Sequence, residues 1–147
     1  MINDIKMCIT FDKPPVWQTL IDAGFTDLKD CIFTYGNVIY NPDMIEITPE
    51  LLAHETMHAR QQAALTTEEV DGRAEWWNRW ILDRAFRAEQ EAQGYGAQYA
   101  HYCKRQKDRN WRAKYLHGIS LHLSGGIYLL TMKQQDARAA IQHRANV

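Results

Sequence analysis

The stretch that most constrains the fold is residues 48–65, TPELLAHETMHARQQAAL. It has the residues typical of a helix N-terminus, because Thr48 can cap the first turn and Pro49 suits the first helical position. Glu50 then stands where the helix dipole favours a negative charge. Apolar residues in the rest of the stretch give the helix a surface to bury. A helix is therefore predicted here, and the remaining elements have to pack around it.

Two histidines of this predicted helix, His54 and His58, are four residues apart, so they project from one face on successive turns. Two imidazoles in that position can both bind one Zn²⁺ at about 2.0–2.1 Å. Glu55 projects about 100° away, where it can act on a water molecule beside the metal. This is the physical content of the H-E-x-x-H pattern, which predicts zinc-dependent peptide hydrolysis with Glu55 as general base. The alternative is a helix whose histidines pair with nearby acids.

The stretch lacks the third protein ligand that a zinc site needs. A His-rich continuation is excluded, because Gln61 and Ala64 stand where its glycine and third histidine would be. A glutamate on a following helix is the main possibility, and Glu89 and Glu91 are the two candidates. Each is followed three residues later by an alanine or a glycine, which would let that helix pack closely on the first one. Three histidines are further candidates: His101, His117 and His122.

The rest of the chain is helical in character, apart from one predicted hairpin. Residues 31–42, CIFTYGNVIYNP, are rich in β-branched and aromatic residues and are interrupted at Gly36-Asn37. Their strand precedes the H-E-x-x-H helix, and its edge could pair with an extended substrate. Helices are predicted over about 14–24, 73–82, 84–106, 111–124 and 134–146. The expected fold is a single domain over residues 1–147, of α+β class and mainly helical, with a small sheet or hairpin.

Composition limits the partners and the location. The 147 residues have a net charge of −1 and a pI near 6.6, which gives no basic footprint for nucleic acid or for an anionic membrane. One basic run, Lys104 to Lys114, is interpreted as a solvated helix face. The first residues lack the apolar core of a signal peptide, and no apolar run approaches the ~18 residues of a membrane span. Three scattered cysteines fit a reducing compartment, so a cytoplasmic location is expected.

Three segments together resemble a known family: HETMHARQQ, then EWWNRWILDRAFRAEQEAQGYGAQY, then LSGGIY. Over residues 38–130 the chain is similar to small phage- and bacterium-associated zinc metallopeptidases of gluzincin type. The resemblance implies a zincin-like minimal domain that uses Zn²⁺ to cleave a peptide or protein substrate. Aligning FR and YGAQY places Glu91 on the ligand glutamate, with Gly94 in place of the usual alanine, whereas Glu89 is offset by two residues. Tyr128 of LSGGIY would then donate a hydrogen bond to the oxyanion of the reaction, and the alternative is that Tyr128 is an ordinary core tyrosine.

Several other residues have simpler roles. Gln61 either fixes the orientation of a metal ligand or solvates the helix end. The three closely spaced tryptophans are predicted to be core residues: Trp76, Trp77 and Trp80.

The competing function is a non-enzymatic phage or virion assembly protein, or a binding protein, with a structural or vestigial metal site. Such a protein could be virion-associated. A structural zinc site is normally closed by four protein ligands, often cysteines, and no cysteine lies near the motif. The peptidase is therefore the favoured interpretation.

Overall fold

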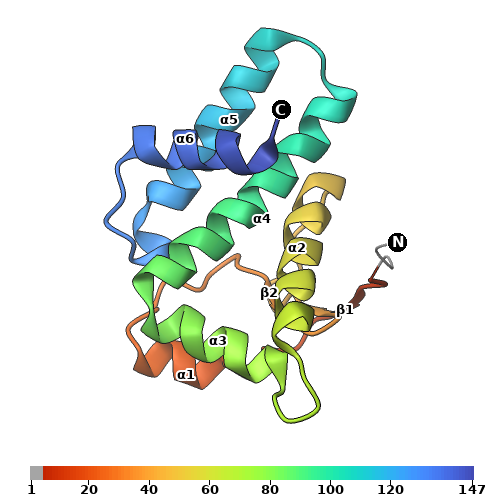
Figure 1. Cartoon of the computed structure of the whole chain (residues 1–147), viewed down its shortest axis with the longest axis vertical. Coiled ribbons are helices and arrows are strands. Elements are labelled where there is room, and N and C mark those ends of the chain that lie inside the picture. The colour runs from red at the N-terminus through yellow and green to blue at the C-terminus, as the bar shows by residue number, and fades with distance from the viewer. Residues whose placement is uncertain (1–4) are drawn as a thin grey trace.

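The computed structural model describes residues 5–147, which form a mainly helical protein with a small three-stranded sheet (Figure 1). The elements in chain order are β1 (Cys8–Thr10), α1 (Trp17–Asp22), β2 (Phe33–Tyr35), β3 (Val38–Tyr40), α2 (Pro49–Leu65), α3 (Gly72–Leu82), α4 (Arg84–Arg105), α5 (Arg109–Ser124), the 3₁₀ turn η1 (Gly126–Tyr128) and α6 (Gln134–Ala145). The predicted α+β, mainly helical class is confirmed.

Residues 1–4 belong to the start that was expected to lack a signal peptide, and they lie outside the described residues. Within residues 5–147, none of the helices combines the length and the apolar character that crossing a membrane requires.

The predicted hairpin is present, and it forms part of the sheet. Strands β2 and β3 run antiparallel and are joined by a two-residue turn in which Gly36 has a φ of 65°, a backbone conformation that favours glycine. Strand β1 was not predicted. It pairs parallel with β3, with Ile9 opposite Ile39, so the strand order is β1-β3-β2. This order leaves β2 at the edge that packs against α2.

Side-chain caps set the ends of the long helices where the sequence predicted them. The hydroxyl of Thr48 accepts a hydrogen bond from the backbone N–H of Leu51 at 3.2 Å, which starts α2. Asp83 ends α3, and its carboxylate accepts from the backbone N–H of Phe86 at 3.1 Å, which starts α4. The break predicted at Asp83 is therefore confirmed. It lets α4 leave α3 in a new direction and pass α2 (Figure 1).

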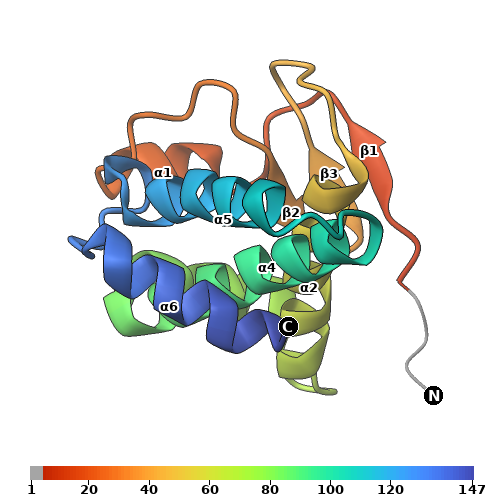
Figure 2. The ribbon, with the colours of Figure 1, turned by 90° about the horizontal axis from the view of Figure 1, so that it is seen from above.

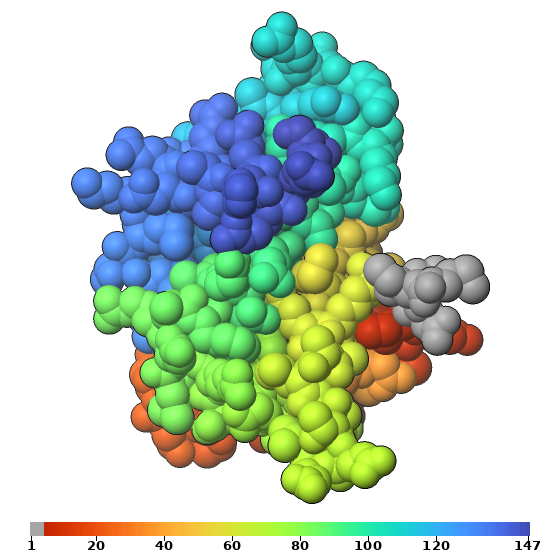
Figure 3. All heavy atoms as spheres, viewed as in Figure 1, coloured from red at the N-terminus to blue at the C-terminus, as the bar shows by residue number. Residues whose placement is uncertain are grey.

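Helix α4 is the central element of the fold and packs against α2, α3, α5 and α6 (Figures 1 and 2). In the view of Figure 3, the side chains of α2, α3, α4 and α6 cover this face of the molecule. One buried core lies among α4, α5 and α6, and it includes Tyr95. A second core lies among α1, β2 and α3, and it contains Trp76, Trp77 and Trp80 as predicted.

The outer edge of β2 is not free along its whole length. The backbone carbonyl of Thr34 accepts hydrogen bonds from Gln62 Nε2 at 2.8 Å and from Trp77 Nε1 at 2.9 Å. The N–H of Gly36 donates to Gln62 Oε1 at 2.7 Å. Side chains of α2 and α3 thus occupy the strand edge that was expected to pair with an extended substrate.

Candidate metal centre

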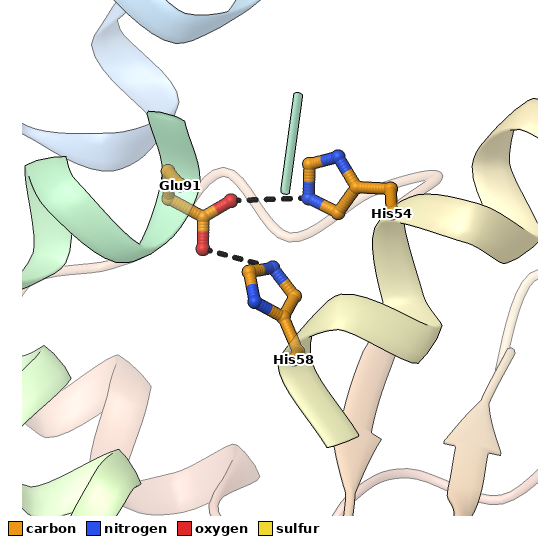
Figure 4. A group of neighbouring side chains, drawn as sticks. All are labelled: His54, His58 and Glu91. Atoms are coloured by element: carbon orange, nitrogen blue, oxygen red, sulfur yellow. Dashed lines mark hydrogen bonds and ion pairs between the residues drawn. The ribbon is translucent and has the colours of Figure 1, made fainter. Parts of the chain in front are cut away.

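Three side chains from two helices converge at one point. Figure 4 shows His54 and His58 of α2 facing the carboxylate of Glu91 on α4. His54 Nε2 lies 3.3 Å from Glu91 Oε1, and His58 Nε2 lies 3.2 Å from Glu91 Oε2. Each of the three residues is no more than 5% exposed. The structure therefore brings together the two histidines and Glu91, one of the two glutamates that the sequence offered.

The spacing of these atoms can be compared with the geometry of a zinc site. Ligand atoms about 2.0–2.1 Å from a tetrahedral Zn²⁺ lie about 3.3 Å from one another. The two contacts of Glu91, at 3.3 and 3.2 Å, are close to that separation, and all the ligand atoms lie within 4.8 Å of one another. Two imidazoles and one carboxylate are also a donor set that zinc accepts. The group could therefore hold a metal ion, and its donor set is one that zinc accepts.

Two glutamines fix which nitrogen each histidine turns toward the carboxylate. His58 Nδ1 lies 2.8 Å from Gln61 Oε1, and His54 Nδ1 lies 2.9 Å from Gln98 Oε1. The amide of Gln61 is oriented unambiguously, because its Nε2 donates to the backbone carbonyl of Gln90, which can only accept. An oxygen facing Nδ1 requires an N–H there, so in the neutral imidazole the lone pair is on Nε2. Both rings thus present Nε2, the form a metal needs.

The Glu91 carboxylate is held from the other side by Trp80, whose indole N–H donates to Oε2 at 2.9 Å. Burial alone would raise the pKa of Glu91, but the neighbouring His58 and His54 hold that pKa below its usual range. Burial would also lower the pKa of His58, but the charge of Glu91 outweighs it and raises the pKa to about 9. Without an ion, the histidines would therefore share protons with the Glu91 carboxylate through hydrogen bonds. A metal ion that binds here has to displace these protons.

Gly94 allows α4 to come this close to α2. A Cβ at this position would lie 2.8 Å from His54 Nε2, which real Cβ atoms essentially never do. The predicted close approach at Gly94 is therefore present, and it is directed at a ligand atom. An alanine at this position would collide with the histidine unless the His54 imidazole or one of the two helices shifted.

The structure does not bring the other candidate ligands to this group. Glu89 is 40% exposed in its side chain and pairs with Arg144 of α6 through two hydrogen bonds of 2.7 Å. His101 lies near the C-terminal end of α4, where its Nδ1 is 3.7 Å from Glu50 Oε1 of α2. Among residues 5–147, the only group of three or more possible metal ligands is His54, His58 and Glu91. His122 lines the adjoining cavity without joining that group.

The glutamate of the motif, Glu55, is 4% exposed and lines a cavity of about 260 Å³ beside the three side chains. Its Oε2 atom is buried and has no hydrogen-bond partner among residues 5–147. Burial raises the pKa of Glu55, although His54 and His58 partly oppose that rise. A buried carboxyl oxygen without a partner is costly, so this atom points to a missing polar group such as water. One water needs about 30 Å³, which leaves space for part of a substrate.

Two tyrosines from different elements close another wall of this cavity. The hydroxyls of Tyr95 on α4 and Tyr128 on η1 lie 2.8 Å apart, and both rings line the cavity. The Tyr95 ring also packs edge-on against His54, with ring centroids 4.5 Å apart. Burial raises the pKa of both phenols, so both keep their protons at neutral pH. Tyr128 was a predicted site residue, but Tyr95 and Gln98 were not recognised from the sequence.

Comparison with protein-family models, with curated proteins and with solved structures gave no significant match.

The glutamine contacts give a testable prediction. Gln61→Leu removes the acceptor that orients His58, and we expect zinc affinity to fall about 10- to 100-fold while the helices remain folded. Competition with a chromophoric chelator measures the affinity, and circular dichroism checks the fold. Gln135→Leu, an exposed change on α6, is the matched control and should leave the affinity unchanged. Equal affinity in the two variants would mean that Gln61 only solvates the helix.

Proposed function

We propose that this protein is a zinc-dependent peptidase with a minimal, zincin-like domain of gluzincin type. His54, His58 and Glu91 would hold the zinc, and Glu55 would act as general base. The observation that carries this proposal is the partnerless Oε2 of Glu55, buried in the same cavity as the three possible ligands. A purely structural site has no use for such a carboxylate, whereas hydrolysis requires a base beside the metal.

The protein's own groups divide the work of hydrolysis between them. A bound zinc would lower the pKa of a coordinated water and polarise the carbonyl of the scissile bond. Glu55 takes the proton from the attacking water and delivers it to the leaving amine. Burial raises the pKa of Glu55, which strengthens its affinity for the proton that it takes from the water. Glu91 would supply the one negative charge among the three ligands, and the hydrogen bond from the Trp80 indole holds its carboxylate in place.

Tyr128 would stabilise the developing oxyanion, and Tyr95 would position it. Two hydroxyls that share one hydrogen bond use only one of their two protons for it. The second O–H is therefore available to a group in the cavity, which both tyrosines line. Tyr95 is fixed by α4 and by its contact with His54, so it can hold the Tyr128 hydroxyl in place.

The tyrosine pair leads to a second prediction. Tyr128→Phe should reduce kcat about 10²- to 10³-fold, the usual effect of removing one oxyanion donor, with little change in KM or zinc content. Tyr95→Phe should reduce kcat less. If Tyr95 acts through Tyr128, the double variant should be no slower than Tyr128→Phe alone. Fully additive losses would show that the two hydroxyls act independently.

The proposed function is tested directly by cleavage of an unbiased peptide library followed by mass spectrometry. Zinc-loaded protein should produce new termini, chelator-treated protein should not, and added zinc should restore the activity. Zinc binding without any cleavage would instead favour the non-enzymatic alternative, a binding or assembly protein with a structural site. Three protein ligands, rather than the usual four, weigh against that alternative.

A further inference from the structure

A second groove, of about 530 Å³, adjoins the metal cavity. Leu51 on α2, Tyr95 on α4 and His122 on α5 line both spaces, so the groove and the cavity adjoin at these three side chains. From His122 the groove follows α5 back toward Lys114, between this helix and α4. A chain whose scissile bond lies in the cavity can therefore continue along this groove.

The walls of the groove are aromatic and partly exposed. The rings of Tyr102 on α4 and Tyr115 on α5 are stacked, with centroids 3.9 Å apart and planes within 4° of each other. Trp111, at the outer end, is 54% exposed although tryptophan is usually well buried. Exposed rings in a concave surface are typical of binding sites, because they offer a large contact area at little entropic cost. The groove is thus suited to a ligand chain.

Positive charge is concentrated at this outer end. Residues 104–114 contain six Lys or Arg and a single acid, Asp108, in a chain whose net charge is −1. The Lys114 ammonium lies 5.1 Å from the centroid of the Trp111 ring, and the Arg105 guanidinium lies 5.2 Å from that of Tyr102. Arg105 is already paired with Glu50. Lys114 has no carboxylate partner within residues 5–147. This lysine lines the groove, so it can bind a carboxylate of another molecule.

We infer that this groove, defined by Trp111, Lys114, Tyr115 and His122, binds an acidic segment of the peptide substrate. The inference rests on the proposed peptidase function. His122 and Lys114 are eight residues apart on one helix, which is about 12 Å. An extended peptide covers that distance in three to four residues. The preferred substrate therefore carries an aspartate or glutamate three to four residues from the substrate residue that contacts His122.

The test uses a series of peptides that share one cleavage site, found with the unbiased library. Glu, Gln or Lys is placed at each of six positions on either side of that site, and kcat/KM is measured at low salt. We expect about a three- to tenfold preference for Glu over Lys, confined to one or two neighbouring positions on one side, and weaker in 0.5 M salt. Lys114→Glu should abolish or reverse this preference.

Arg109→Glu is the matched control, because it makes the same charge change on the same helix about 140° away from Lys114. The Arg109→Glu variant should keep the wild-type preference for Glu over Lys in the substrate. Binding of the same peptides to zinc-loaded Glu55→Gln protein, measured by calorimetry, supplies a readout that does not depend on turnover.

The outcomes separate the two proposals. Cleavage without an acidic preference, or with a preference that Lys114→Glu leaves intact, overturns the acidic-segment inference and leaves the peptidase standing. Lys114-dependent binding of acidic peptides without cleavage in the wild type supports the groove and overturns the peptidase. Displacement of bound peptide by a short single-stranded oligonucleotide of higher affinity would assign the aromatic, basic groove to nucleic acid instead.

Discussion

Replacing Glu55 by glutamine should abolish peptide hydrolysis while leaving the zinc in place. The amide has the same shape and fits the same buried position, but it cannot take a proton from water. We expect kcat to fall about 10²- to 10⁴-fold, with zinc affinity and melting temperature close to those of the wild type. Single-turnover kinetics on a library-derived peptide measures the rate of cleavage, and competition with a chelator measures the zinc affinity.

Glu69→Gln is a suitable control for this experiment, because it makes the same chemical change at an exposed position outside the site. It should cleave as fast as the wild type. If Glu55→Gln also cleaves at the wild-type rate with full zinc content, Glu55 is not the base. Its buried, partnerless oxygen would then need another explanation.

Glu91→Ala should weaken zinc binding far more than Glu89→Ala, although the two residues are neighbours on one helix. The first change removes a ligand and leaves the Trp80 N–H and two histidine nitrogens facing an empty space. We expect a loss of affinity of more than about a hundredfold, beyond the 10- to 100-fold typical of residues that only orient ligands. Glu89→Ala breaks a side-chain hydrogen bond with Gln93 and a partly exposed ion pair with Arg144, and the ion pair contributes about 0–1 kcal/mol to stability.

Glu91→Gln provides a volume-matched check in case Glu91→Ala fails to fold. The neutral amide can still accept from Trp80, but it is a much weaker zinc ligand, so its affinity should also fall. Greater damage from Glu89→Ala than from either Glu91 variant would contradict the site as described here.

Elements defined by local chemistry could be predicted from the sequence. Thr48 and Pro49 start α2, Gly36 turns the hairpin, and Asp83 separates α3 from α4, each through a bond or a backbone angle set within a few residues. Strand β1 could not be predicted in this way. It has only three residues, its side chains are largely exposed, and it forms by pairing with β3 some thirty residues away.

The candidate site shows the same division. His54, Glu55 and His58 are recognisable because one helical turn brings them together. The choice between Glu91 and Glu89 depends on how α4 is rotated against α2. A pattern in the sequence could have indicated it, since Glu91, Gly94, Tyr95 and Gln98 recur at helical spacing on one face. The contacts of Gln98 with His54 and of Tyr95 with Tyr128 could not be predicted, because they depend on how separate elements pack.

We propose that His54, His58 and Glu91 bind one zinc ion, and the zinc content per chain is the measurement that decides it. Elemental analysis of purified wild type incubated with zinc and then desalted should give about one zinc per chain, and His58→Ala should give close to none. A crystal of the wild type should show an anomalous peak at the zinc edge between the three side chains. Wild-type protein that retains no zinc, or retains as much as His58→Ala, would contradict the claim.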